Sequence, residues 1–247
     1  MKIFGKHAVR SAFKSGRFIQ TLWLSDTLKP SISQEFQQLA KVYHTRVQVV
    51  PSQKINSMCL GENTQGIVAE VTAYSFTAWE TFLEKAVNSP EVFFLFLDRI
   101  QDPHNLGAIL RTADAVGIDG VIIPKHESVS LTEGVAKASA GAIERVPVAQ
   151  VTNLIPCIQS LKEQNVWIAG FDTQASQEYT QADLTGSISL VIGAEHEGLR
   201  AGIKKQCDFL LHIPMHSHTA SLNASVASAL AMYEVVRQRN LTLKEPS

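Results

Sequence analysis

The chain has 247 residues, of which 45% are hydrophobic and 18% charged, and its formal net charge is −1. This composition excludes intrinsic disorder, and no stretch approaches the roughly 18 consecutive apolar residues of a membrane helix. The first residues carry charges without an apolar core, so we expect no signal peptide. Three widely separated cysteines, Cys59, Cys157 and Cys207, are typical of a reducing cytosol. We therefore expect a cytoplasmic globular protein without a membrane partner.

The N-terminal segment is basic, although the chain as a whole is not. Lys6, Arg10 and Lys14 follow an i, i+4, i+8 spacing, so on a helix they form one stripe. Such a stripe is either a solvated helix face or a surface that contacts phosphates. The charge pattern alone leaves both interpretations open.

Residues 1–74 alternate between short helical and strand patterns, which predicts a small α/β domain. Residues 7–15 favour a helix, and a second helix has an apolar face of Phe36, Leu39, Ala40 and Tyr43. Strands are expected at residues 19–24, 46–50 and 66–71.

A linker and connecting helix are expected over residues 75–90. Thr77 and Glu80 have the spacing of a capping box, and Pro90 follows the end of the helical pattern.

Residues 91–247 read as repeated strand–helix units, which predicts a parallel sheet covered on both faces. Val92–Leu97 is a continuous apolar run, and Gly117 ends the helix that follows it. Further strands are expected at residues 121–123, 166–171, 188–192 and 209–213, and a last helix at 222–239.

Ligands of such sheets bind beyond the carboxyl ends of the strands, where three loops have unusual composition. In the first loop, residues 98–107, Asn105 is placed to cap the next helix. That helix carries Arg111, which either reaches the strand ends or pairs with Asp114.

The second loop, residues 192–198, contains Glu195 and Glu197 between Gly193 and Gly198. This turn could bind the amino group or hydroxyls of a ligand, or the glycines could only form a tight turn after the strand. It lacks the G-x-G-x-x-G pattern of dinucleotide-binding proteins.

The third loop, residues 213–223, enters the last helix, which Ser221 or Asn223 can cap. Backbone N–H groups at that helix start could point at a ligand. The helix is rich in small residues, which favour either core packing or a subunit interface: Ala224, Ala227, Ser228 and Ala231.

Three histidines at the third loop, His212, His216 and His218, raise the question of a metal site. No cysteine or carboxylate lies beside them at ligand spacing, so we expect no metal. No Ser-His-Asp or G-x-S-x-G pattern supports hydrolase chemistry.

The three loops together resemble the motifs of the SpoU (TrmH) RNA ribose methyltransferases, in the family's order and spacing. The matching segments are residues 102–111, 191–195 and 213–215 with 221–223. Residues 5–9 and 65–66 resemble the family's L30e-like substrate-binding domain. The whole chain is most similar to members that methylate a guanosine 2′-hydroxyl in bacterial 23S rRNA.

This resemblance implies a SPOUT catalytic domain with a parallel sheet and a C-terminal trefoil knot, which periodicity alone does not predict. It also implies S-adenosylmethionine as cofactor, RNA as partner and a homodimer with active sites at the subunit interface. By position, Gly193, Ile213 and Leu222 match cofactor-contacting residues. The polar active-site set is matched by Asn105, Arg111, Glu195, Ser221 and Asn223.

The family's reaction transfers a methyl group to a weakly nucleophilic 2′-hydroxyl. A guanidinium is always protonated, so we expect Arg111 to hold a phosphate and stabilise charge developing on O2′. The proton then passes to water, the phosphate or Glu195. His196, Ser217 and Thr64 depart from the family's usual residues, and Thr64 bears on which RNA is the target.

Two rival functions follow from the same residues. One is a tRNA 2′-O-ribose methyltransferase of the same family, and the other is an RNA-binding homologue that has lost catalysis. The intact motif residues argue against the second.

Overall fold

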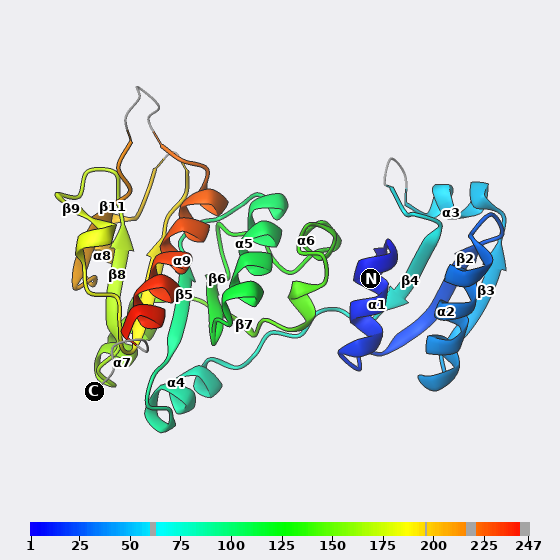
Figure 1. Cartoon of the computed structure of the whole chain (residues 1–247), viewed down its shortest axis with the longest axis horizontal. Helices are drawn as coiled ribbons and strands as arrows, with labels where there is room; N and C mark the ends of the chain where they lie inside the picture. The colour runs from blue at the N-terminus through cyan, green and yellow to red at the C-terminus, as the bar shows by residue number, and fades with distance from the viewer. Residues whose placement is uncertain (60–62, 196, 216–220, 243–247) are drawn as a thin grey trace. The chain divides into compact units, whose positions relative to one another are not determined.

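The computed structural model describes residues 1–59, 63–195, 197–215 and 221–242 and divides the chain into two compact units (Figure 1). The first unit combines Met1–Ser75 with the later segment Leu131–Arg145. The second unit comprises Phe76–Ser130 and Val146–Ser247. The expected division into residues 1–74, 75–90 and 91–247 did not anticipate that a later segment belongs to the first unit.

A four-stranded mixed sheet in the order β1-β4-β2-β3 is the centre of the first unit. β2 and β3 are parallel, whereas β4 is antiparallel to both β1 and β2. Phe13, Phe36 and Ile55 come from its helices and are completely buried or nearly so. The strands are β1 (Lys2–Phe4), β2 (Ile19–Ser25), β3 (Arg46–Val50) and β4 (Ile67–Val71). The helices are α1 (Lys6–Lys14), α2 (Pro30–Val42), α3 (Ser52–Met58), α6 (Glu133–Ala138) and η1 (Ala142–Glu144).

The second unit has a seven-stranded parallel sheet in the order β7-β6-β5-β10-β8-β11-β9. The strands are β5 (Phe93–Leu97), β6 (Gly120–Pro124), β7 (Val148–Val151), β8 (Trp167–Phe171), β9 (Gln177–Glu178), β10 (Ile188–Ile192) and β11 (Phe209–His212). The helices are α4 (Trp79–Asn88), α5 (Pro103–Val116), α7 (Leu154–Lys162), η2 (Tyr179–Gln181), α8 (Ala201–Lys204) and α9 (Ala224–Thr242). The parallel sheet confirms the α/β class expected for this region.

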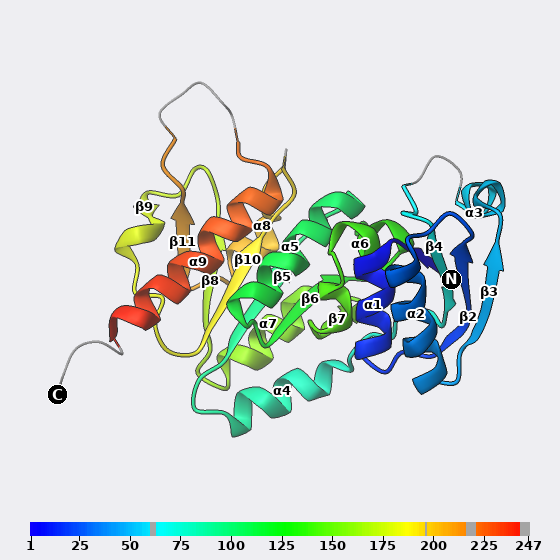
Figure 2. The same ribbon diagram turned by 45° about the vertical axis from the view of Figure 1, so that its right-hand side comes forward.

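Helices cover both faces of this sheet, which explains the continuous apolar run of β5. Phe94 and Phe96 pack in one core cluster with residues of α4, α7 and α8, such as Phe82 and Ile158. On the other side α5 and α9 contact one another and lie side by side in both views (Figures 1 and 2). All five residues of β5 are therefore buried.

Two helix starts differ from expectation. α4 begins after Ala78 without a side-chain cap, so the expected capping box of Thr77 and Glu80 does not form. α5 is capped by Asp102, whose carboxylate accepts a hydrogen bond from the His104 N–H at 2.9 Å. Asn105, expected to cap this helix, lies inside its first turn and is free for other contacts.

The basic stripe of α1 is only partly available to an external partner. The Arg10 guanidinium binds the Glu35 carboxylate at 2.6 Å and lies over the Phe36 ring, 5.5 Å from its centroid. The hydrogen bond from Arg10 lowers the pKa of Glu35. This internal pairing favours the solvated-face interpretation for Arg10.

No helix within the described residues is long and apolar enough to span a membrane. The trefoil knot stays a prediction, since residues 216–220 of the third loop lie outside the described part of the chain.

Candidate active site

The three sequence-predicted loops meet at the carboxyl edge of the second unit's sheet. The ends of β8, β10 and β11 enclose a cavity of about 310 Å³. All three residues expected to contact the cofactor, Gly193, Ile213 and Leu222, line this cavity. Glu195 and Ser221 line it as well. The structure thus brings five of the eight predicted site residues to one cavity.

Gly193 is held against the backbone of the turn that follows it. A Cβ atom there would lie 2.3 Å from the carbonyl carbon and oxygen of Gly198 and 2.6 Å from the Leu199 nitrogen. The Gly198 N–H closes the turn by donating to the Ala194 carbonyl at 2.8 Å. Glycine is therefore required at position 193 by the close approach of the turn's own backbone.

Glu195 is the centre of a hydrogen-bonded cluster that joins all three loops. Its Oε1 accepts from Asn105 Nδ2 at 2.8 Å, from the Ala224 N–H at 3.2 Å and from Asn223 Nδ2. Asn223 Nδ2 is also 2.9 Å from Asn105 Oδ1. These donors fix the orientation of the carboxylate and leave its second oxygen, Oε2, to other partners.

Asn223 also determines where α9 starts. Its Oδ1 accepts from the Ser225 N–H at 2.9 Å and from the Ser225 hydroxyl at 2.6 Å. Asn223 is therefore the cap of α9, and Ser221, the other candidate, lines the cavity instead. One asparagine thus holds both the helix start and the Glu195 cluster.

A second cavity of about 490 Å³ adjoins the first. The two share Ala194, Glu195, Glu197 and Ala224 as lining residues. The remaining wall of the second cavity comes from residues 99–102, Asn105 and Glu127. Glu195 therefore faces two adjacent spaces, each large enough for part of a ligand.

A buried carboxylate that the sequence analysis did not single out supports these loops. Asp98, at the end of β5, is completely buried and binds Arg200 Nη2 at 2.7 Å. Its backbone N–H donates to the Ile192 carbonyl at 2.8 Å, which joins the ends of β5 and β10. The sequence offered one signal for this pair. Asp98 directly follows a buried strand, and a carboxylate buried there needs a charged partner.

A second acid–base pair missed by sequence reasoning lies at the first cavity. Asp172 and Lys204 both line it and form an ion pair. Burial alone would raise the pKa of Asp172, but hydrogen bonds from Lys204 and from the Gln174 N–H bring it below its ordinary value. Asp172 is therefore a fixed negative charge at neutral pH.

Arg111 belongs neither to the Glu195 cluster nor to the lining of the two cavities. It lies two turns into α5, and its side chain is exposed to solvent. Its guanidinium is therefore accessible to a charged ligand from outside.

The small residues of α9 prove to be largely internal. Ala224, Ser228 and Ala231 are at most 3% exposed, which supports core packing for them. The opposite face of the helix is apolar and exposed, with Val226 at 46%, Leu230 at 39% and Tyr233 at 54%. Sequence analysis did not separate these two faces, because both are apolar.

Among the described residues, no group of three His, Cys, Asp or Glu side chains is arranged to hold a metal ion. His216, His218, His196 and Ser217 lie outside that part of the chain. Thr64 is buried, and its hydroxyl accepts from the Gly66 N–H at 3.2 Å.

Comparisons with known proteins identify the family to which the chain belongs. The family described as "SpoU rRNA Methylase family" matches residues 92–233, and "RNA 2′-O ribose methyltransferase substrate binding" matches residues 2–77. The chain is 44% identical over 239 residues to "Putative TrmH family tRNA/rRNA methyltransferase YacO" of Bacillus subtilis, covering 96% of each protein. A relative of the same description from Staphylococcus saprophyticus is 45% identical over 240 residues, again covering 96% of each.

Among solved structures, the fold is similar to that of the SpoU methyltransferase AviRb from Streptomyces viridochromogenes, crystallised with the cofactor AdoMet. The TM-score is 0.80 at 23% identity, covering 98% of this chain and 91% of AviRb. The two family matches and the curated relatives together show that the chain belongs to the SpoU family of S-adenosylmethionine-dependent RNA 2′-O-ribose methyltransferases.

Proposed function

We propose that this protein methylates the ribose 2′-hydroxyl of a guanosine in 23S rRNA, in the cytoplasm, with S-adenosylmethionine as donor. The observation that carries the proposal is the Glu195 cluster, which joins Asn105 and Asn223 beside two adjoining cavities, the first of which the cofactor-motif residue Gly193 also lines. The choice of guanosine and of 23S rRNA rests on the whole-chain resemblance described above.

The first cavity fits the methyl donor. Its volume of about 310 Å³ lies within the range of about 300–1,000 Å³ that is usual for ligand sites. Ile192, Leu211 and Ile213 offer apolar contacts, and Asp172 and Lys204 offer charges for the polar end of the ligand. When bound, S-adenosylmethionine supplies an electrophilic methyl group on a sulfonium.

The second cavity is the place we assign to the target nucleotide. It shares Glu195 with the first cavity, so a ribose in it lies next to the donor and beside that side chain. Alignment of nucleophile and methyl group supplies much of the catalysis in such a displacement. In this arrangement the main contribution of the protein to catalysis is to position the two substrates.

Glu195 Oε2 is the proton acceptor in this proposal. With Oε1 occupied by three donors, Oε2 accepts a hydrogen bond from the 2′-hydroxyl. It would take the hydroxyl proton as O2′ displaces the sulfur from the methyl carbon, with the donor's sulfur leaving as a neutral thioether. Water and the substrate phosphate are the competing acceptors, and substitution of Glu195 distinguishes them from the carboxylate.

Arg111 binds a phosphate of the RNA. A guanidinium stays protonated and presents a planar set of donors that suits phosphate oxygens. Its exposed position on α5 is open to a large polyanion. We assign it the further role of stabilising negative charge on O2′, for which its side chain must reach the second cavity when RNA binds.

The protein acts as a homodimer through the exposed face of α9. Val226, Leu230 and Tyr233 follow an i, i+4, i+7 spacing and form a continuous apolar strip. An exposed apolar strip of this kind favours contact with another protein surface. In a two-fold dimer the strips of the two copies pack against each other.

Methyl transfer from labelled S-adenosylmethionine to 23S rRNA fragments and to total tRNA tests the proposal. Mass spectrometry of the digested RNA identifies the modified nucleoside. We expect 2′-O-methylguanosine in the rRNA alone. Label in tRNA would support the tRNA enzyme instead, and cofactor binding without transfer to either RNA would support the inactive homologue.

A further inference from the structure

The first unit contains a segment that comes from the middle of the second. After β6 the chain leaves the second unit, folds as α6 and η1 within the first, and returns to the second unit at β7. The chain therefore passes between the units three times, after Ser75, Ser130 and Arg145. We call Leu131–Arg145 the strap.

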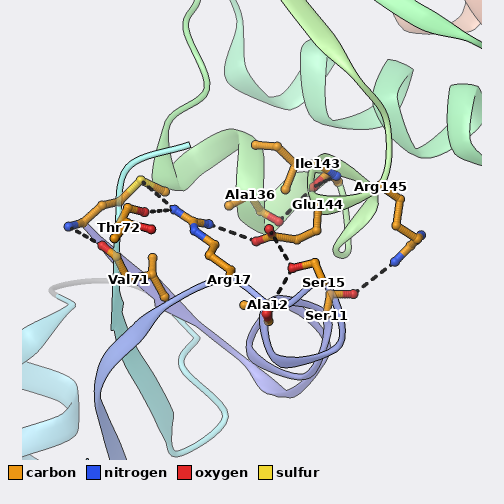
Figure 3. A network of polar contacts seen from close by, with 12 residues as sticks. Ser11, Ala12, Ser15, Arg17, Val71, Thr72, Ala136, Ile143, Glu144 and Arg145 are labelled. Atoms are coloured by element: carbon orange, nitrogen blue, oxygen red, sulfur yellow. Dashed lines mark hydrogen bonds and ion pairs between the residues drawn. The ribbon is translucent and has the colours of Figure 1, made fainter. Parts of the chain in front are cut away.

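A buried ion pair holds the strap to the N-terminal part of the first unit. Arg17 Nη1 lies 2.9 Å from Glu144 Oε1, and the two side chains are only 7% and 6% exposed. Ser15 donates to Glu144 Oε2 at 3.2 Å, and Arg17 donates to the Thr72 carbonyl. Figure 3 shows Arg17 between Thr72 and Glu144. Removing one partner of a buried ion pair costs far more folding free energy than removing one partner of a surface pair, because the other charge stays buried without its partner.

Tyr74 completes the surroundings of Arg17. The guanidinium carbon lies 3.5 Å from the centroid of the Tyr74 ring. Burial raises the pKa of Tyr74, and the nearby Glu144 carboxylate raises it further, so the ring stays neutral. Arg17 thus binds a carboxylate, a carbonyl and an aromatic face at once.

Close packing fixes the strap at a second point. Gly141 lies so near α1 that a Cβ atom there would be 2.1 Å from the Ser11 hydroxyl oxygen. Arg145 Nη1 donates to the same hydroxyl at 3.1 Å. At the other end of the strap, the Glu133 carboxylate accepts from the Lys2 N–H.

The chain just before the strap is fixed to the wall of the second cavity. Ser128 Oγ and the Val129 N–H donate to the Ile100 carbonyl at 3.0 and 2.8 Å. Ile100 lines that cavity, and Glu127 lines it as well. A continuous stretch of residues therefore runs from the proposed nucleotide site into the first unit.

We infer that the strap positions the substrate-binding unit for catalysis and that Arg17 and Glu144 are positioning residues. This inference rests on the proposed function. Loss of the ion pair removes the buried contact that holds one end of the strap and loosens it there, so RNA held by the first unit reaches the second cavity less often. Binding of S-adenosylmethionine involves the second unit alone and stays unchanged.

The test compares Arg17→Met with Lys85→Met, which removes one cation from a half-exposed ion pair of the second unit. Hydrogen exchange of residues 131–145 reports release of the strap without any assay of activity. Steady-state methylation gives KM for RNA and kcat, and calorimetry gives Kd for S-adenosylmethionine. An Arg17→Glu, Glu144→Arg double variant restores an ion pair with reversed charges.

We expect Arg17→Met to speed exchange of the strap and to raise KM for RNA by about tenfold, a size usual for coupled sites. Its kcat and its Kd for the cofactor should match those of Lys85→Met, and the charge-reversed pair should recover part of the change. Should Arg17→Met not fold, Arg17→Met with Glu144→Leu removes both buried charges and is measured instead. If hydrogen exchange of residues 131–145 is unchanged in Arg17→Met, or is faster while KM for RNA is unchanged, the inference is overturned. Absence of methylation by the unmodified protein overturns the proposed function instead.

Discussion

Replacing Glu195 by glutamine or by alanine separates the structural role of this residue from its chemical role. Alanine leaves three donors without their acceptor: Asn105 Nδ2, Asn223 Nδ2 and the Ala224 N–H. Because the site is partly open to water, each loss costs about 1 kcal/mol, at the low end of the usual range. The total of about 3 kcal/mol corresponds to a decrease of roughly 6–12 °C in Tm for a domain of this size.

Glutamine keeps one oxygen for the same three donors and replaces Oε2 by an amide nitrogen. We expect Glu195→Gln to lose about 1 kcal/mol, or about 2–4 °C in Tm. Its turnover should fall by about 100- to 10,000-fold, the usual contribution of a positioned base. Cofactor affinity should change little, since the backbone of the Gly193 turn is unaffected.

Scanning calorimetry gives the two Tm values, and single-turnover methylation of RNA gives the rate of the chemical step. The rate should be measured across pH for Glu195→Gln and for the unmodified protein. A glutamine variant with a rate within about fivefold of normal refutes Oε2 as the proton acceptor and favours water or phosphate. An alanine variant without loss of Tm refutes the structural part of the reasoning.

Three further predictions concern the cofactor turn, the phosphate contact and the dimer. Gly193→Ala should abolish cofactor binding in calorimetry, because its Cβ would lie 2.3 Å from the Gly198 backbone, whereas Gly202→Ala meets only the Ile155 Cδ1 atom at 3.3 Å and should bind normally. Arg111→Lys keeps the charge but loses the planar donors, so kcat should fall and KM for RNA should rise; normal kcat with only a raised KM would remove the assigned role in charge stabilisation. Tyr233→Asp places a charge on the exposed strip of α9, so ultracentrifugation should show the 27.1 kDa monomer where the unmodified protein sediments as a dimer. A monomeric unmodified protein contradicts the proposed interface.

Much of the second unit could be predicted because its strands are buried on both faces. The apolar runs at residues 92–97 and 188–192 correspond to β5 and β10, and Gly117 ends α5 in the left-handed conformation at φ 70°. β7 and α7 were missed, although Asn153 caps α7. The apolar runs in the sequence thus identified the central strands but not β7, which lies at one edge of the sheet.

The candidate site was predicted by its residues but not by its contacts. Sequence placed Asn105 as a helix cap, whereas Asp102 caps α5 and leaves Asn105 to bind Glu195. Two cap residues three positions apart satisfy the same local pattern, and only the tertiary contact with Glu195 decides between them. The strap has no local signal either, because Arg17 and Glu144 meet only after the chain folds.

The central claim is that this site methylates a ribose 2′-oxygen of RNA. The most direct measurement is mass spectrometry of 23S rRNA treated with the unmodified protein and with Glu195→Gln, after the modified position has been mapped. We expect one 2′-O-methylguanosine with the unmodified protein and almost none with the variant, and no transfer when that position carries a 2′-deoxyribose. A methyl group on a base, or transfer to the deoxyribose substrate, contradicts the account.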